Sequence, residues 1–312
     1  LEQQNPAQNE SSRGDELQAQ IAALRTRATT TWDDIGNLSE CKIAIKSAYA
    51  FALARRPAGV CHQPVSKILL YGPPGTGKTM LAAAASNELD ATFYYVKASA
   101  MLSKWFGESS RLISVLYQDA AAHAPAVIFL EEFDALAPRR SDSDSGAERR
   151  IVSTLLAELD GLSQVTQRAQ YVLTIAATNL PWDIDPAILS RFGGRLLYVP
   201  LPDAASRAQI LDKNLRGRGY ETKVPLEELV ARTDGFSGRD LANLCTIAVE
   251  RMELEHNPQI LDLKGRESLS RYELRIAPLT EEHFAYAFAR VIPQTRPSEL
   301  QRFETWQRQA ER

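Results

Sequence analysis

Residues 67–79 read Lys67-Ile-Leu-Leu-Tyr-Gly72-Pro-Pro-Gly-Thr-Gly-Lys-Thr79, and the run Met80-Leu-Ala-Ala-Ala-Ala85 follows directly. The residues before Gly72 form an apolar run rich in branched side chains, which predicts a buried strand. The alanine-rich run after Thr79 strongly favours a helix. The stretch therefore predicts a strand, a glycine-rich loop and a helix, in that order.

The loop from Gly72 to Thr79 has the composition of a phosphate-binding loop. Its glycines let backbone N–H groups close around phosphate oxygens, and the helix that follows points its positive end at the same anion. Lys78 is expected to reach the β- and γ-phosphates, and the Thr79 hydroxyl to ligate Mg²⁺. A tight turn with an incidental lysine is the alternative, but all four fixed positions and both flanking elements match. The motif predicts nucleotide binding and leaves open what the nucleotide is used for.

Composition and charge limit the other functions that the chain can have. Its 312 residues suffice for one large and one small domain, and 44% hydrophobic with 24% charged residues is typical of a soluble globular protein. The formal net charge of -3 predicts no general attraction to nucleic acid or to an anionic membrane, although a local basic pore stays open. No apolar run approaches the ~20 residues that span a bilayer, and the polar N-terminus does not fit a signal peptide.

Cysteine usage and the first residue give two further expectations. The three cysteines are widely spaced without a metal-ligand pattern, which fits a reducing compartment. We expect a cytoplasmic protein, with the nucleus as the alternative, that meets membranes only through its partners. Because the sequence opens on Leu1, we expect it to be part of a longer chain with an N-terminal targeting or adaptor domain.

Polarity and periodicity divide the chain into four parts. Residues 1–30 are expected to hold a disordered tail and a helix from Asp15 to about Ala28, either a linker, which we favour, or a coiled-coil stub. Residues 31–201 are predicted to form a large α/β domain, residues 202–296 a small helical domain, and residues 297–312 a C-terminal helix.

The large domain is predicted to contain a parallel sheet. Five apolar runs alternate with helical segments, at residues 67–71, 92–96, 127–130, 171–176 and 196–199. This alternation predicts parallel strands covered by helices on both faces. Further helices are expected at 39–55, 204–216, 226–233, 238–256, 280–291 and 297–312, whereas residues 257–278 are irregular and receive no assignment.

Polar side chains follow two of these strands. Ligands of parallel sheets bind at the carboxyl ends of the strands, so Glu131 and Glu132 are expected beside the phosphate loop. Glu131 is then the metal partner and Glu132 the base that polarises an attacking water, with a solvated acidic strand end as the alternative. Asn179, at the tip of the next strand, is expected to orient that water or contact the γ-phosphate, or else to cap a turn.

Two further groups point beyond a single protomer. Arg191 and Arg195 flank Phe192-Gly-Gly194, and a phosphoryl transition state gains from an arginine that a neighbour supplies, although surface arginines are usually solvated. Lys104-Trp105-Phe106 places two large aromatic residues in a polar stretch, where they either join the core or form a gripping surface. The residues alone leave that choice open.

Together, these motifs resemble an AAA ATPase domain. The resemblance extends from about Thr31 to Trp306 and rests on motifs in that family's order and spacing: GPPGTGKT (72–79), residues 127–134, TIAATNLPWDIDPA (174–187), the Arg191 region, VPLPD (199–203) and DGFSGRDL (234–241). NLPWDID and SKWFGES (103–109) are most similar to the branch of katanin, spastin, fidgetin and the ESCRT-III-disassembling ATPases. The fold class implied is α/β, a P-loop parallel sheet sandwiched by helices and followed by a small all-helical lid domain.

The resemblance implies a Mg²⁺-dependent ATPase that forms a homo-oligomeric ring, usually a hexamer, with ATP at each interface and a polypeptide substrate in the central pore. It implies no specific binding of nucleic acid. Carried over residue by residue, it implies catalytic roles for Glu132, Asn179, Arg191 and Arg195, nucleotide contacts from Asp34, Ile35, Gly36, Pro74, Gly75, Thr76, Gly77, Lys78, Thr79, Met80 and Gly238, metal ligation by Thr79 and Glu131, and a substrate pore loop of Lys104, Trp105 and Phe106.

Three positions depart from that family's pattern. Glu131 stands where Asp is usual, which adds roughly 1.5 Å of reach in a demanding octahedral shell, so Glu131→Asp is expected to raise the ATPase rate. Ser190 replaces the first of two adjacent arginines, so Arg191 and Arg195 must carry the contact in trans. Arg239 replaces a small residue and either reaches a phosphate or points to solvent.

The favoured function is an ATP-driven machine that remodels, unfolds or disassembles protein substrates. An ATP-gated assembly scaffold with weak hydrolysis, because of Glu131, is the alternative. A small-molecule or nucleotide kinase is disfavoured by the sensor, finger and pore motifs.

Overall fold

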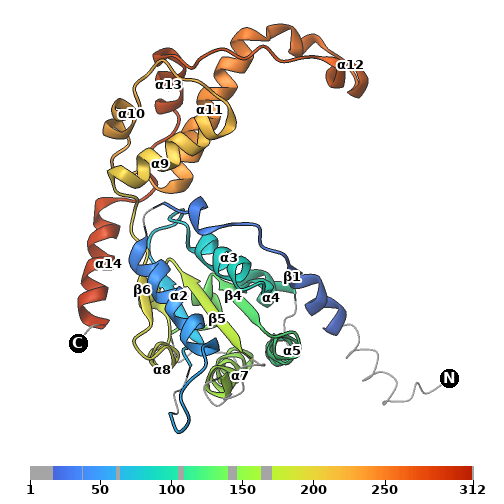
Figure 1. Ribbon diagram of the computed structural model, residues 1–312, viewed down its shortest axis with the longest axis vertical. Coiled ribbons are helices and arrows are strands. Elements are labelled where there is room, and N and C mark those ends of the chain that lie inside the picture. The colour runs from blue at the N-terminus through green and yellow to red at the C-terminus, as the bar shows by residue number, and fades with distance from the viewer. Residues whose placement is uncertain are drawn as a thin grey trace, which may run out of the picture. The chain divides into compact units, whose positions relative to one another are not determined.

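The computed structural model describes residues 17–36, 38–60, 64–104, 109–139, 146–162 and 171–310 (Figure 1). The chain divides into two compact units. The first unit comprises Leu1–Gly72, Gly77–Val199 and Thr305–Arg312, and the second comprises Pro73–Thr76 and Pro200–Glu304.

The first unit is built on a sheet whose described strands run in the order β1-β3-β4-β5-β2-β6. Strands β2 to β6 pair in parallel, as the sequence predicts, and Leu69 lies opposite Ala176 of β5 and Leu196 of β6. The strands are β1 (Arg25–Thr26), β2 (Lys67–Tyr71), β3 (Thr92–Lys97), β4 (Ala126–Glu131), β5 (Val172–Thr178) and β6 (Leu196–Tyr198).

Helices cover both faces of this sheet (Figure 1). One core packs α2 and α3 against strand residues such as Phe129, and the other packs α5 and α7 against residues such as Ile128. Consecutive strand residues point to opposite faces, which is why neighbours on β4 enter different cores. The helices of this unit are η1 (Trp32–Asp34), α2 (Ser39–Leu53), α3 (Lys78–Glu88), α4 (Ala98–Lys104), α5 (Ser109–Ala122), α6 (Phe133–Leu136), α7 (Gly146–Leu162), η3 (Pro181–Asp183) and α8 (Pro186–Arg191).

The N-terminal segment differs from its prediction. The helix expected from Asp15 to about Ala28 covers residues 17–24 of the described chain, and β1 follows it at once. Arg25 and Thr26 of β1 pair antiparallel with Tyr94 and Phe93 of β3. Pairing satisfies backbone groups at the edge of the sheet that a longer helix would leave open. Tertiary pairing therefore overrides the helical pattern here.

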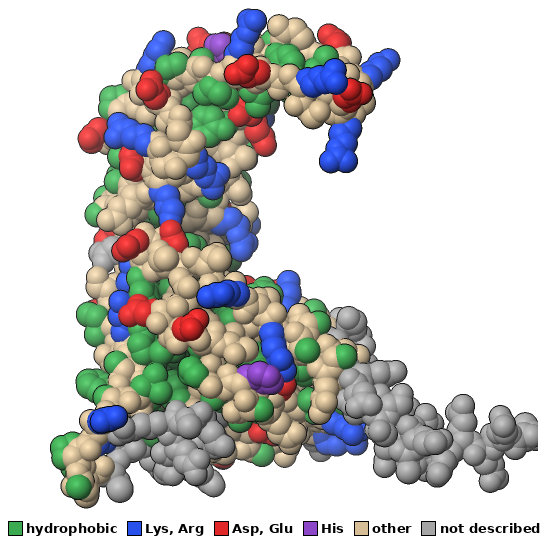
Figure 2. All heavy atoms as spheres, turned by 45° about the vertical axis from the view of Figure 1, so that its right-hand side comes forward, with side chains coloured by type: hydrophobic (Ala, Val, Ile, Leu, Met, Phe, Trp, Pro, Cys, Tyr) green, Lys and Arg blue, Asp and Glu red, His purple; other side chains and the backbone are tan. Residues whose placement is uncertain are grey.

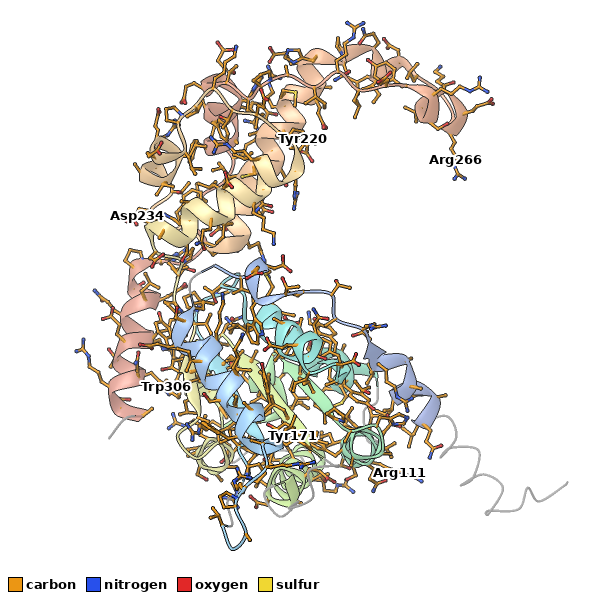
Figure 3. The ribbon with its side chains drawn as sticks, viewed as in Figure 1. Arg111, Tyr171, Tyr220, Asp234, Arg266 and Trp306 are labelled. Atoms are coloured by element: carbon orange, nitrogen blue, oxygen red, sulfur yellow. The ribbon has the colours of Figure 1, made fainter. Side chains whose placement is uncertain are left out.

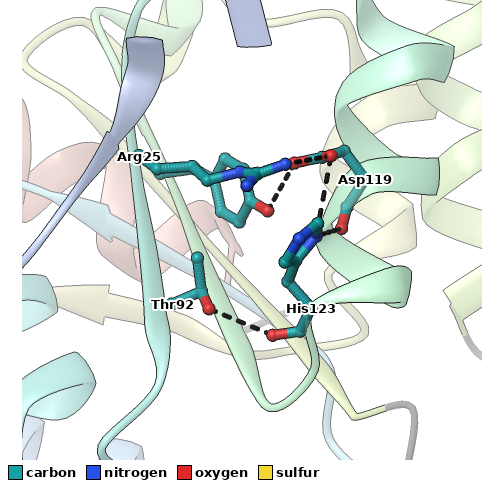
Figure 4. A network of polar contacts seen from close by, with 5 residues as sticks. Arg25, Thr92, Asp119 and His123 are labelled. Atoms are coloured by element: carbon teal, nitrogen blue, oxygen red, sulfur yellow. Dashed lines mark hydrogen bonds and ion pairs between the residues drawn. The ribbon is translucent and has the colours of Figure 1, made fainter. Parts of the chain in front are cut away.

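A polar network holds β1 in place (Figure 4). Arg25 donates to the Asp119 carboxylate at 3.0 Å from Nε and 2.5 Å from Nη2, and the Tyr94 hydroxyl donates to it at 2.6 Å. We call Arg25, Tyr94 and Asp119 the clasp. Burial raises the pKa of Asp119, but the hydrogen bonds from Arg25 and Tyr94 outweigh it, and the pKa lies below its usual range.

The second unit is helical around its own core, which includes Leu211, Leu244 and Phe284. Side chains cap its helices: Asp203 accepts from the Ser206 amide at 2.7 Å, and Ser237 and Asp240 form a capping box. Its elements are α9 (Ala204–Asn214), η4 (Arg216–Arg218), α10 (Leu226–Arg232), α11 (Gly238–His256), η5 (Pro258–Asp262), α12 (Arg266–Arg271) and α13 (Glu281–Phe288), and α14 (Pro297–Ala310) follows.

Residues 257–278, which the sequence leaves unassigned, are organised by Asn257. This side chain is fully buried, donates to the Arg275 carbonyl at 2.9 Å and accepts from the Arg275 amide at 2.7 Å. The Tyr272 hydroxyl adds a bond to the same Oδ1 at 3.2 Å. One buried amide thus closes the segment that contains η5 and α12.

The C-terminal end of α14 packs on the first unit. The Trp306 ring lies edge-on to Tyr71 of β2, with the ring centroids 4.7 Å apart and the planes at 67° (Figure 3). On the visible face of the second unit, basic and acidic side chains are interspersed (Figure 2). Within the described residues, no helix combines the length and apolarity needed to cross a bilayer.

Candidate nucleotide site

The topology brings the predicted polar residues to one edge of the sheet. Strands β4, β5 and β2 are neighbours in the order β4-β5-β2, and all three run parallel. Their carboxyl ends lead into Glu132, Asn179 and Gly72 respectively. We call this edge, with Thr79, Glu131, Glu132 and Asn179, the phosphate edge. Such an edge is where parallel sheets bind ligands.

Backbone geometry explains why the loop after β2 needs glycine. Gly72 has φ +147°, and a Cβ there would lie 2.2 Å from the Val199 carbonyl oxygen. Gly77 is left-handed with φ 96° and is the N-cap of α3, so the first turn of that helix begins at the end of the loop. Lys78 is buried and donates from Nζ to the Gly72 carbonyl at 2.8 Å. The lysine amine therefore lies over the loop that it is predicted to serve.

Gly75 and Gly238 meet closely within the second unit. A Cβ on Gly75 would lie 2.7 Å from Ser237 Oγ, and a Cβ on Gly238 would lie 3.1 Å from the Gly75 carbonyl oxygen. The Arg239 amide donates to that oxygen at 3.2 Å, while the Arg239 side chain is exposed. The backbone at the start of α11 thus contacts the loop directly.

The donors at the phosphate edge fit a magnesium ion. The Thr79 hydroxyl donates to Glu131 Oε1 at 3.1 Å, and the Tyr95 hydroxyl donates to Glu131 Oε2. Burial, followed by the bond to Glu131, raises the pKa of Tyr95 to about 12, so the phenol stays a donor at neutral pH. In the described residues, no group of three or more His, Cys, Asp or Glu side chains could form a complete protein cage for a metal. Hydroxyl and carboxylate oxygens completed by phosphates and water are what Mg²⁺ usually takes.

Glu132 is held apart from Glu131 by different partners. Its backbone is left-handed with φ 56°, and its carboxylate accepts from Ser99 Oγ and pairs with Lys97 Nζ at 3.0 Å. The Ser99 hydrogen bond, followed by that of Lys97, lowers the pKa of Glu132, so it is a carboxylate at neutral pH. Neither Ser99 nor Lys97 was given a role from the sequence, because their contact crosses from β3 and α4 to the end of β4.

Asn179 offers an unsatisfied acceptor at the same edge. Its Oδ1 atom is buried and has no hydrogen-bond partner. The preceding Thr178 donates to Asp134 Oδ1 at 2.5 Å and accepts from the Leu180 amide at 2.9 Å, which fixes the turn after β5. A buried acceptor without a partner is costly, and a ligand or water would relieve it.

The two candidate fingers lie in different surroundings. Arg191 Nε donates to both Asp160 oxygens at 3.2 and 3.3 Å, and its Nη1 lies 3.3 Å from Ser190 Oγ. The guanidinium of Arg191 is thus engaged with α7 rather than with the P-loop of its own chain. Arg195 has an exposed side chain, and its carbonyl accepts from the Leu69 amide at 2.9 Å.

The segment predicted to lie against the adenine is compact. The Asp34 carboxylate accepts from the Thr31 amide at 2.7 Å in a capping box, Ile35 is buried, and Lys42 Nζ donates to the Ile35 carbonyl at 2.8 Å. Trp105, Phe106 and the side chain of Lys104 fall outside the described residues, so the structure does not bear on the pore-loop prediction.

Comparisons with known proteins agree with the site and the fold. Residues 68–200 match the ATPase family associated with various cellular activities (AAA), and residues 223–253 match the AAA+ lid domain. The katanin p60 ATPase-containing protein A-like 1 is 36% identical over 281 residues in Homo sapiens and in Danio rerio, which is 88% of this chain and 56% or 57% of those proteins. The chain spans about half the length of the curated relatives it matches.

Solved structures give the same result. The FIGL-1 AAA domain superposes with a TM-score of 0.78 at 30% identity, over 94% of this chain and 95% of that chain. The FIGL-1 AAA domain in complex with ADP superposes with a TM-score of 0.75 at 29% identity, over 95% and 96%.

The chain therefore belongs to the AAA ATPase family, with a nucleotide-binding domain and an AAA lid. This confirms the predicted fold class and identifies an ATP-hydrolysing enzyme. Within the family, the chain belongs to the katanin and fidgetin branch, as the sequence resemblance predicts.

Proposed function

We propose that this domain is the Mg²⁺-dependent motor of a homo-oligomeric ring, a hexamer, that uses ATP hydrolysis to remodel, unfold or disassemble protein substrates. The observation that carries the proposal is the division of labour between two adjacent carboxylates. Glu131 contacts the P-loop hydroxyl of Thr79, whereas Glu132 is held by Ser99 and Lys97. In-line phosphoryl transfer needs one group for the metal and another for the attacking water.

Each residue then has a defined task. Thr79 and Glu131 would hold Mg²⁺, which when bound neutralises charge that develops on the phosphate oxygens. Phosphate oxygens would replace the Gly72 carbonyl as the partner of Lys78, since an ammonium group binds an anion more strongly than a neutral acceptor. Asn179 would use its buried Oδ1 to accept a hydrogen bond from the attacking water.

Glu132 would accept the proton of that water. Because Ser99 and Lys97 hold its pKa down, their hydrogen bonds weaken it as a base. Turning the carboxylate from these partners to the water would raise its basicity at the moment of attack.

The ring part of the proposal rests on arginines and on family membership. Arg191 and Arg195 would act on the nucleotide of a neighbouring protomer, which is supported by the engagement of Arg191 with Asp160 rather than with its own P-loop. Lys104, Trp105 and Phe106 would grip an extended polypeptide in the pore. We place the working units at residues 31–201, 202–296 and 297–312, in a protein of the cytoplasm or nucleus that meets membranes only through partners and binds no specific nucleic acid.

Phosphate release tests the proposal. Turnover per protomer should rise with protein concentration, require Mg²⁺, and fall by about 10²- to 10⁴-fold in Glu132→Gln, which removes the base. Turnover that stays negligible at high concentration with Mg²⁺ would instead support the ATP-gated scaffold. Turnover that is independent of protein concentration would contradict a site completed by a neighbour.

A further inference from the structure

We propose that Tyr95 is a positioning residue for Glu131, and that the two form a matched pair which makes a glutamate work where this family usually has an aspartate. The inference rests on the proposed role of Glu131 toward Mg²⁺. It names a residue that the sequence pattern does not single out.

The register of the sheet puts the two side chains on one face. Tyr95 of β3 lies opposite Phe129 of β4, and Glu131 follows two residues later. Since side chains two apart on a strand share a face, Glu131 and Phe129 both point to the side covered by α3. Tyr95 packs there too, with its ring centroid 6.0 Å from that of Phe129. Its hydroxyl can therefore reach one position along β4, diagonally, to the carboxylate.

The length of the side chain decides whether this diagonal contact can form. The Tyr95 hydroxyl donates to Glu131 Oε2. An aspartate is shorter by one C–C bond, about 1.5 Å, which is enough to break a hydrogen bond whose donor is fixed by packing. The tyrosine thus fits a glutamate and not an aspartate at this position.

The contact also sorts the two carboxylate oxygens. Tyr95 engages Oε2, and Oε1 faces the Thr79 hydroxyl at 3.1 Å. Because Thr79 gives its proton to Oε1, the lone pairs of its oxygen stay available as a ligand. Tyr95 therefore fixes the rotation of the carboxylate in the orientation that serves Thr79. Partners of this kind usually set the affinity of a metal site.

The pair reverses an expectation drawn from the sequence alone. If position 131 were merely suboptimal, Glu131→Asp would raise activity. If Tyr95 and Glu131 are matched, Glu131→Asp loses the Tyr95 contact and weakens the response to Mg²⁺.

Tyr94 supplies a matched control on the same strand. Its side chain points to the opposite face, where its hydroxyl donates to Asp119 at 2.6 Å. Tyr94→Phe and Tyr95→Phe each delete one hydroxyl that binds a carboxylate, so any difference between them reports the place of the hydroxyl and not the loss of a tyrosine.

The experiment measures binding rather than turnover. In the full chain carrying Glu132→Gln, a fluorescent ATP analogue is titrated with Mg²⁺ and, separately, in EDTA. Tyr95→Phe should raise the Mg²⁺ concentration at half effect by about tenfold, with binding in EDTA unchanged. Tyr94→Phe should leave both values unchanged. Tyr95→Phe combined with Glu131→Asp should match Glu131→Asp alone, since the shorter side chain has already lost the contact.

Three results would decide against the pair. An unchanged Mg²⁺ midpoint in a folded Tyr95→Phe protein overturns it, as do additive effects of the two substitutions or an equal effect of Tyr94→Phe. Thermal unfolding of each variant verifies that it is folded. If the parent protein itself shows no Mg²⁺-dependent binding, the proposed function fails rather than the pair alone.

Discussion

Consecutive tyrosines of β3 serve two regions on opposite faces of one sheet. In the clasp, Tyr94 donates to Asp119, whose charge is also matched by Arg25 at 2.5 Å. At the phosphate edge, Tyr95 and Thr79 donate to Glu131 through hydroxyl groups. The comparison teaches that a carboxylate paired with an arginine inside the fold serves stability, whereas one oriented by hydroxyls keeps its charge for an incoming cation.

The largest expected effect concerns an arginine that resembles the clasp by its contacts. Arg191 binds Asp160 much as Arg25 binds Asp119. If it acts in trans, Arg191→Ala lowers phosphate release by about 10³-fold or more while binding of a nucleotide analogue by the monomer is retained.

Asp160→Ala is the control, because it removes the partner and keeps the arginine. It should retain most of the activity. Normal turnover of Arg191→Ala would assign this arginine to stability, like Arg25, and remove it from the mechanism.

A smaller effect is expected in the clasp itself. Arg25→Met removes a two-pronged, partly buried contact to Asp119 and should lower the free energy of unfolding by about 1 to 3 kcal/mol, as measured by urea titration. Arg27 is the control: it is 3.9 Å from Asp90, and both side chains are more than nine-tenths exposed. Arg27→Met should change stability very little, since exposed pairs contribute little. Equal effects of the two substitutions would show that β1 is not held by the clasp.

The pH dependence of the clasp is smaller still. The folded pKa of Asp119 lies below its unfolded value, so the stabilisation is fully present above the unfolded pKa of about 3.9 and is lost as the pH falls through the folded pKa. The stability difference between the parent and Arg25→Met should therefore be constant from neutral pH down to about pH 5 and shrink below it. A difference that stays constant down to the acid limit would mean that Asp119 is not the partner.

The features that the sequence predicts well are those written locally. The strand, glycine loop and helix from Lys67 onward follow from composition over a short window, and α11 covers Gly238–His256 as its capping residues predict. The carboxylates after β4 are predicted because the strand itself is so plainly apolar. These local signals also carry the family resemblance.

The features that the sequence misses depend on pairing across the chain. Arg25 and Asp119 lie 94 residues apart, and β1 is two residues long, too short to show any period. Tyr95 and Glu131 lie 36 residues apart and meet only because β3 and β4 pair in one register. A tyrosine in an apolar strand predicts burial, and only the register shows which carboxylate its hydroxyl can reach.

Thermal unfolding of the full chain with ATP, with and without Mg²⁺, tests the contrast most directly. In the Glu132→Gln background, a ligand that binds the folded state raises the midpoint. Asp119→Asn should lower the midpoint without nucleotide and keep the additional rise that Mg²⁺ gives. Glu131→Gln should keep the midpoint without nucleotide and lose that rise. An undiminished Mg²⁺-dependent rise in Glu131→Gln would contradict the account.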